Sequence, residues 1–127
     1  MTTEEDVLTS LDHYEHAVIR VAGEFRAHDA PVEPRHVRLD DLDSIVVDYG
    51  TAGQCRTYSL GGLPAVASVE EAIVELTDLL QEKVLEAGDT AWPGCLPGHR
   101  HPPSARLVSG AAVWTCPEHG TTLARLG

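Results

Sequence analysis

The chain has few aromatic residues, few basic residues and no long apolar run. Aromatic side chains make up 5% of its 127 residues, so we expect a core built mainly from aliphatic side chains. Hydrophobic residues reach 43%, which is enough for the core of one ordinary domain. No apolar run approaches the roughly 20 residues of a membrane-spanning helix. The acidic start, Met1–Asp6, lacks the basic and apolar regions of a signal peptide, so we expect a cytoplasmic protein.

Basic side chains are not only scarce but unevenly placed. Residues 1–90 contain 19 acidic side chains against six basic ones, a balance of −13. Residues 91–127 contain three arginines against Glu118, a balance of +2, which gives the formal net charge of −11. An acidic body repels a phosphate backbone, and the chain has no basic stripe that would release counterions. The charge therefore argues against nucleic acid as a partner and suits a protein with a basic surface.

Two segments have the residue spacing of amphipathic helices. Apolar residues three and four positions apart between residues 7 and 25 predict a long first helix, with Thr2 as its cap and Pro31 beyond its end. A second apolar stripe between residues 72 and 84 predicts another helix. Ser68 and Glu71 have the spacing of a capping box at its start, and Gly88 is a natural stop after its end.

Between these helices the pattern changes to that of strands. We predict a strand from Ile45 to about Tyr49, a turn at residues 50–53, and a return strand from Cys55 to Leu60. His36–Leu39 is a candidate edge strand, and Gly61-Gly62 is interpreted as a connection. The predicted fold class is α+β: two amphipathic helices packed on a small antiparallel sheet form an α-β-β-α body over residues 1–90.

The remaining residues, 91–127, are too rich in proline and glycine to build an independent core. A bound metal ion can stabilise the fold of such a segment in place of a core. We therefore predict a tail consisting of a β-hairpin bound to zinc. Trp92 and Trp114 lie near its two cysteines, where we expect them to shield the metal and replace the missing core.

The metal prediction rests on cysteine and histidine residues close together in the sequence. Cys116-Pro-Glu-His119-Gly has the form of a zinc knuckle, in which one tight turn supplies two ligands. Cys95 and His99 form a second pair, with a spacing that is usual for zinc ligands. The predicted ligands are thus Cys95, His99, Cys116 and His119, with His101 as the alternative to His99.

The layout Trp-Pro-x-Cys, His-x-His-Pro and Val-Trp-x-Cys-Pro also resembles the C-terminal tails of small, uncharacterised actinobacterial proteins. The resemblance covers about 28 residues and implies metal binding, without an activity to carry over. Such tails often have proline directly after the first cysteine, whereas this chain has Leu96 there.

Three other residues are candidates for separate sites. His13 and His16, with Asp12, share one side of the first helix and would suit a second metal, but no third strong ligand is evident, so we interpret them as surface residues. Cys55 beside Arg56 is a candidate nucleophile. We favour a small core residue in a strand for Cys55.

The sequence supports two functional hypotheses. The first is a non-enzymatic module in which zinc is structural and the protein binds another protein; a homodimer is a further candidate assembly. The second is a zinc-dependent hydrolase, which needs an open metal position and a nearby carboxylate. Glu118 is the nearest carboxylate, but we expect it to point outward from the knuckle.

Overall fold

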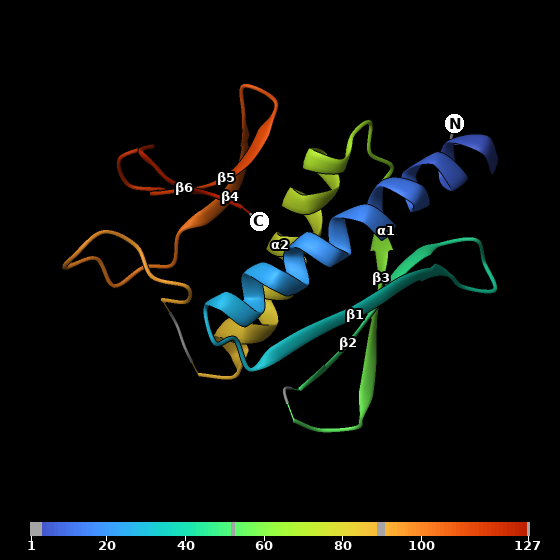
Figure 1. The fold of residues 1–127 in the computed structure, drawn as a ribbon, viewed down its shortest axis with the longest axis horizontal. Coiled ribbons are helices and arrows are strands. Elements are labelled where there is room, and N and C mark those ends of the chain that lie inside the picture. Colours follow the sequence, from blue (N-terminus) through green and yellow to red (C-terminus); the bar gives the residue numbers. More distant parts are fainter. Residues whose placement is uncertain (1–3, 52, 89–90, 127) are drawn as a thin grey trace.

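Two helices and two three-stranded antiparallel sheets make up the fold of the computed structural model, which describes residues 4–51, 53–88 and 91–126 (Figure 1). In chain order the elements are α1 (Glu4–Ala27), β1 (Val32–Leu39), β2 (Ile45–Thr51), β3 (Thr57–Leu63), α2 (Val69–Glu86), β4 (Ser104–Val108), β5 (Ala111–Thr115) and β6 (Thr122–Arg125). The predicted α+β class is confirmed, and each predicted hairpin has a third strand.

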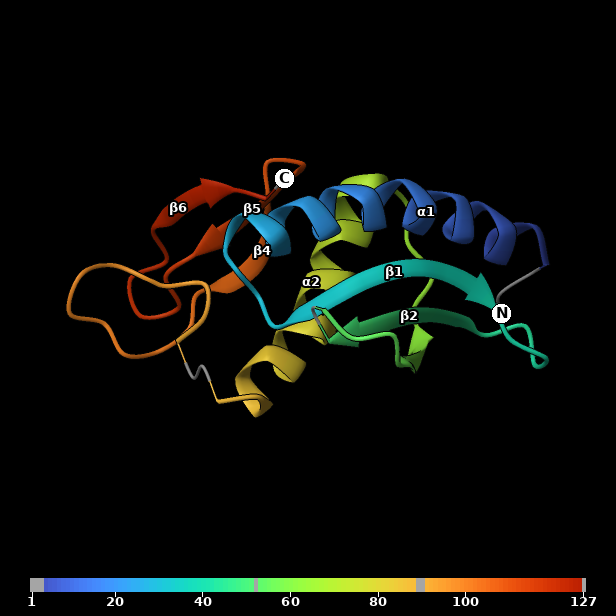
Figure 2. The same cartoon turned by 60° about the horizontal axis from the view of Figure 1, so that its bottom comes forward.

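The helices lie together on one face of the β1-β2-β3 sheet, and the β4-β5-β6 sheet contacts α2 near the C-terminal end of α1 (Figure 2). Helix α1 buries one face, including Tyr14, Val21 and Phe25, as its apolar spacing predicts. The hydroxyl of Tyr14 donates a 2.6 Å hydrogen bond to the carbonyl of Pro64, which fixes α1 to the connection after β3. The predicted cap, Thr2, lies outside the described residues.

Strand β1 is longer than the predicted edge strand. It begins at Val32 rather than His36, because Val32 and Val37 both enter the core, and its register shifts between Pro34 and His36. Pro34 is tolerated in this strand because β1 lies at the edge of the sheet.

Strand β3 begins and ends later than predicted. It starts at Thr57, so Cys55 lies in the preceding loop, and it continues through Gly61-Gly62 to Leu63. The interpretation of the two glycines as a connection was wrong, because Leu63 pairs with Ile45 and is buried against the helices.

Helix α2 begins as its capping pattern predicts. The amide of Glu71 donates to the hydroxyl of Ser68 over 3.1 Å. The carboxylate of Glu71 accepts from the amide of Ala67 over 2.9 Å, one residue before the cap itself. Gly88 follows the end of α2 at a φ of 117°, a conformation that suits glycine.

The tail packs into the same core as the body. Trp92, Trp114 and Leu126 are buried in one hydrophobic cluster with residues of α1, α2 and β1. The ring of Trp92 meets that of Phe25 edge to face, with centroids 4.6 Å apart. The indole of Trp114 donates to the Glu24 carboxylate over 2.9 Å. The tryptophans therefore attach the tail to α1, and β6, which the sequence pattern did not reveal, leads Leu126 into the shared core.

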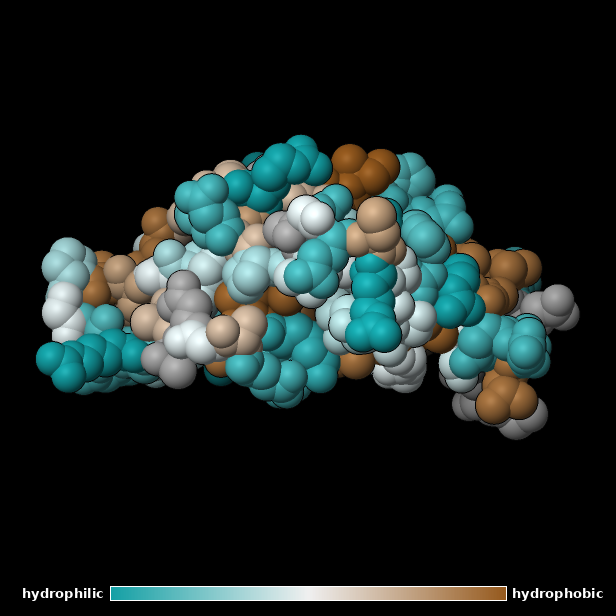
Figure 3. Space-filling model, turned by 90° about the horizontal axis from the view of Figure 1, so that it is seen from below, coloured by the Kyte–Doolittle hydropathy of each residue, from teal (hydrophilic) through white to brown (hydrophobic). Residues whose placement is uncertain are grey.

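None of the described helices combines the length and apolar character that crossing a membrane requires. Seen from below, the surface is largely hydrophilic, and its hydrophobic residues occur in separate areas rather than one broad patch (Figure 3).

Candidate metal centre

Four potential metal ligands meet where two loops of the tail come together. Cys95, His99 and His101 lie in the loop that joins α2 to β4, and Cys116 follows β5. One ligand atom from each of the four lies within 4.8 Å of the others, so these side chains are close enough to hold a metal ion. Cys116 is fully buried, whereas the other three are half-buried.

The three distances from His99 to the other ligand atoms are close to those expected around a tetrahedral zinc ion. Zn–S bonds of about 2.3 Å and Zn–N bonds of about 2.0 Å at tetrahedral angles place sulfur and nitrogen about 3.5 Å apart and two nitrogens about 3.3 Å apart. His99 Nδ1 lies 3.6 Å from Cys95 Sγ and 3.5 Å from Cys116 Sγ. His99 Nδ1 also lies 3.1 Å from His101 Nε2. The residues present therefore fit one tetrahedral metal ion.

The turn between β5 and β6 positions Cys116. The amide of Cys116 donates to the carbonyl of Thr121 over 2.8 Å, and the amide of Gly120 donates to the carbonyl of Cys116 over 2.6 Å. Gly120 closes the turn at a φ of 69°, which glycine adopts without the strain that a side chain would add. The knuckle form predicted for residues 116–120 is thus present in the backbone.

The loop that carries Cys95 is also built from tight turns. The amide of Gly94 donates to the carbonyl of Ala91 over 2.8 Å, and that of His99 donates to the carbonyl of Leu96 over 3.0 Å. Burial and the nearby Cys116 thiol raise the pKa of Cys95, against a hydrogen bond from the Leu96 amide that lowers it. A bound metal ion would replace the thiol protons and the sulfurs would bind it as thiolates.

A glutamine of α2 holds both ends of this loop. The side-chain amide of Gln81 donates to the carbonyl of Trp92 over 3.0 Å and to that of Pro103 over 2.9 Å. Gln81 and Pro103 are both buried. Sequence reasoning missed Gln81, although a signal was available: it lies directly after Leu80 and three residues before Val84, at the edge of the apolar stripe.

His119, predicted as the fourth ligand, lies outside the group of four. It forms a second group with His99 and Glu118, whose ligand atoms also lie within 4.8 Å of one another. The rings of His99 and His119 have centroids 5.3 Å apart. Both His99 and His101 are in the first group, a combination that neither predicted ligand set contains.

The carboxylate of Glu118 approaches the centre. Its side chain is 60% exposed, but Oε2 lies 3.3 Å from Nε2 of His101. Glu118 is thus exposed, as expected, but its carboxylate also approaches His101 of the first loop, which the sequence did not predict.

The other candidate residues do not reach this centre. Cys55 is exposed in the loop before β3, so the expectation of a buried strand residue was wrong. On α1, Nδ1 of His16 lies 3.8 Å from Asp12 Oδ2, and both side chains are 66% exposed. Among the described residues, neither His13 nor His16 belongs to a group of three potential ligands.

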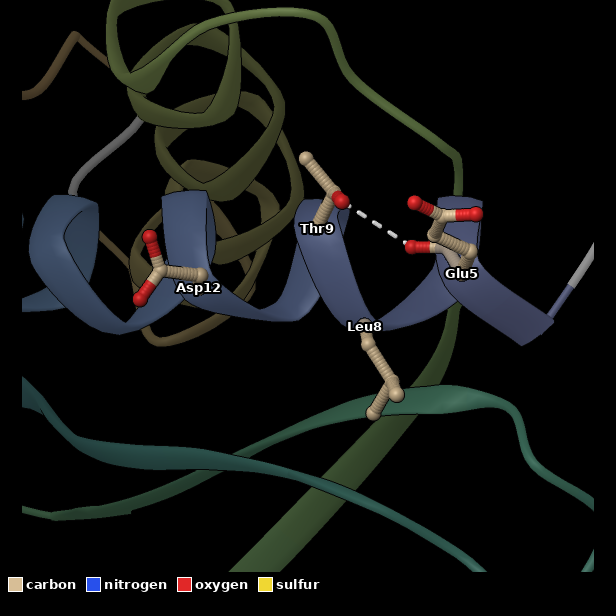
Figure 4. A pocket seen from close by; sticks show the side chains of 4 residues that line it. All are labelled: Glu5, Leu8, Thr9 and Asp12. Carbon is tan, nitrogen blue, oxygen red and sulfur yellow. Dashed lines mark hydrogen bonds between the residues drawn. The ribbon is translucent and has the colours of Figure 1, made fainter.

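Asp12 also lines an open depression on α1 with Glu5, Leu8 and Thr9 (Figure 4). The hydroxyl of Thr9 donates to the carbonyl of Glu5 over 2.9 Å, while Leu8 points toward the strands. Among the residues that the structure describes, this depression has two carboxylates from one helix face but no converging set of donors, in contrast to the cysteine and histidine cluster.

Comparison with known proteins adds no assignment: no family model matches the chain, and no similar protein was found among curated proteins or solved structures.

Proposed function

We propose that this chain is a zinc-binding protein in which Cys95, His99, His101 and Cys116 hold one structural zinc ion, and that it acts as a non-enzymatic protein-interaction module. The observation that carries the proposal is the set of spacings between these four ligand atoms, which suit a tetrahedral ion. Two thiolates and two imidazoles form a donor set that binds zinc in preference to magnesium or calcium.

The architecture around the ligands supports a structural role. The loop of residues 91–103 has no helix or strand of its own, and its cysteine and histidines converge on the Cys116 turn. Four protein ligands complete the tetrahedral coordination sphere of the ion and leave no position for water or substrate. The metal would thus bring two loops together beside a core that is already shared with the helices.

The charge supports a partner protein with a basic surface. The net charge of −11 is concentrated in the first 90 residues. On the edge strand β4, Leu107 and Val108 are 46% and 42% exposed and offer a small apolar contact. A second copy of the chain is the alternative partner. We place the protein in the cytoplasm, where cysteines that form no disulfide stay reduced and able to bind metal.

The test is the metal content and the coordination of the purified protein. We expect one zinc ion per chain by elemental analysis, and a cobalt-substituted form with the absorption bands of tetrahedral thiolate coordination. Cys116→Ser should lose these bands, whereas Cys55→Ser, which changes an exposed cysteine outside the centre, should keep them. A wild-type protein that binds no stoichiometric metal would refute the proposal.

A zinc-dependent hydrolase is the second candidate, and the position of Glu118 favours it. A carboxylate 3.3 Å from a ligand nitrogen is well placed to act as a base if one ligand gives way to water. The cobalt spectrum separates the two candidates: added anions would leave a closed four-ligand site unchanged and would shift the bands of an open one.

A further inference from the structure

The metal centre has more donors than a four-coordinate ion can use. The inner set consists of Cys95, His99, His101 and Cys116, and the outer set of His99, Glu118 and His119. The two sets share His99. Glu118 and His119 are exposed, whereas Cys116 is fully buried. The outer set therefore lies on the solvent side of the inner one.

The outer donors are also within reach of the inner ones. Oε2 of Glu118 lies 3.3 Å from the inner ligand atom Nε2 of His101, and the ring of His119 lies 5.3 Å from that of His99. An ion held by the outer donors would thus need only a short displacement to reach the thiols. Apart from Cys95, the residues of the two sets come from two short segments, 99–101 and 116–119. No large movement of the chain is therefore required.

We infer that Glu118 and His119, together with His99, form a capture site at which a zinc ion binds before it enters the inner set. This inference rests on the proposed function, because it requires the inner set to be the final metal site. A hydrated zinc ion accepts carboxylate and imidazole ligands readily, and these donors are available at the surface without desolvation.

The transfer is a ligand exchange. The ion first replaces water ligands with His99, Glu118 and His119. Its bonds to Glu118 and His119 then break as bonds to Cys95, Cys116 and His101 form, while His99 stays bound. The last waters leave, and the two thiol protons pass to solvent. No oxidation or reduction takes place, and removal of the metal follows the same steps in reverse.

A capture site of this kind has a kinetic signature. Because it lies on the path in both directions, removing it slows entry and release of the metal by the same factor and leaves the equilibrium dissociation constant unchanged. A residue that ligates the bound ion, or supports its ligands, behaves differently: its loss speeds release and weakens affinity.

The experiment uses cobalt-loaded protein, whose thiolate absorption reports the inner set directly. The variants are Glu118→Gln/His119→Ala and Glu118→Gln alone. The matched control is Asp12→Asn/His16→Ala, which removes another exposed carboxylate and imidazole from α1. Release is followed after adding EDTA at several concentrations and extrapolating to zero chelator. The dissociation constant is measured by competition titration, so that the entry rate follows from the two values.

We expect the double variant to release cobalt several-fold more slowly than wild type, with an unchanged dissociation constant and an unchanged spectrum. Glu118→Gln should show a smaller slowing, and the control should match wild type. Equal release rates, faster release with weaker binding, or the same slowing in the control would each overturn the capture site while leaving the structural metal in place. Only a wild-type chain without thiolate–cobalt absorption would remove the proposed function as well.

Discussion

Gln81 is the residue that connects α2 to the ligand-bearing loop. Its amide pairs with the carbonyls of Trp92 and Pro103 in a buried position. Gln81→Leu would leave both carbonyls buried without a donor, and each such group costs about 1–3 kcal/mol. We expect the free energy of unfolding of the metal-loaded protein to fall by roughly 2–6 kcal/mol in urea denaturation.

Gln54→Leu is the control for this prediction, because Gln54 has an exposed side chain in the loop before β3. It should change the free energy of unfolding little. Equal stability of the two variants would mean that the loop does not depend on Gln81.

His101 and His119 should differ in their effect on the affinity for metal. His101 Nε2 lies among the inner ligand atoms, whereas His119 belongs to the outer group. We expect His101→Ala to weaken cobalt binding by roughly a hundredfold, since one of four ligands is lost from a total binding free energy of about 10–16 kcal/mol. His119→Ala should leave the dissociation constant close to that of wild type. The reverse order would identify His119 as the inner ligand.

Between elements, Glu70 of α2 joins α1 to the β4-β5-β6 sheet. Its carboxylate forms a short ion pair with Arg20 of α1, accepts from the Ala112 amide of β5 over 3.4 Å, and lies 3.4 Å from Arg125 of β6. Arg20 in turn donates to the carbonyl of Leu126 over 2.9 Å. Burial would raise the pKa of Glu70, but hydrogen bonding and charge from Arg20 outweigh it and hold the pKa below its ordinary value.

This lowered pKa predicts a pH-dependent contribution to stability. The contribution is present above the pKa of an unfolded glutamate, about 4.3, and is lost as pH falls toward and through the lower folded pKa. We expect Glu70→Gln to be less stable than wild type at pH 7, with the difference shrinking below about pH 4.

The variant and wild type are compared at each pH by thermal denaturation. Any bound metal would be lost from both proteins in acid, so this effect cancels in the difference between Glu70→Gln and wild type. Glu86→Gln provides the control, because the exposed Glu86 pairs with Lys83 of the same helix. A difference between Glu70→Gln and wild type that stays constant from pH 7 to pH 3 would contradict the assigned ion pair.

For the whole molecule, the shared core would couple a metal ion bound in the tail to the helices. Trp92, Trp114 and Leu126 pack in the same cluster as Phe25 and Leu80. Removing the metal with a chelator should therefore lower one common unfolding temperature. Free zinc at a hundred times its dissociation constant adds about 2.7 kcal/mol, equivalent to a shift of roughly 10 °C in a chain of this size.

Circular dichroism at 222 nm and tryptophan fluorescence report the helices and the tail respectively. Coincident transitions by the two probes are the expected result. Loss of the fluorescence transition at a lower temperature, with the helices unchanged, would show that residues 91–126 unfold as a separate unit.

The sequence by itself determined the features that depend on near neighbours in the chain. The spacing of apolar side chains placed both helices, since a helical face repeats over three or four residues. The Ser68 cap and the Gly120 turn followed from local backbone chemistry. Cys95, His99 and Cys116 could be identified as candidate ligands because short pairs of cysteine and histidine suit one metal ion.

Only the tertiary structure decided the features that depend on distant partners. Strand β6 and the full length of β1 exist because Leu126 and Val32 find a common core. His101 rather than His119 lies in the inner group, and Glu118 contacts His101. Both features arise where two loops meet that are separated by 15 or more residues in the sequence. Local spacing allows either histidine to approach the cysteines, and only the packing of both loops against the helices sets which one lies within 4.8 Å of both of them.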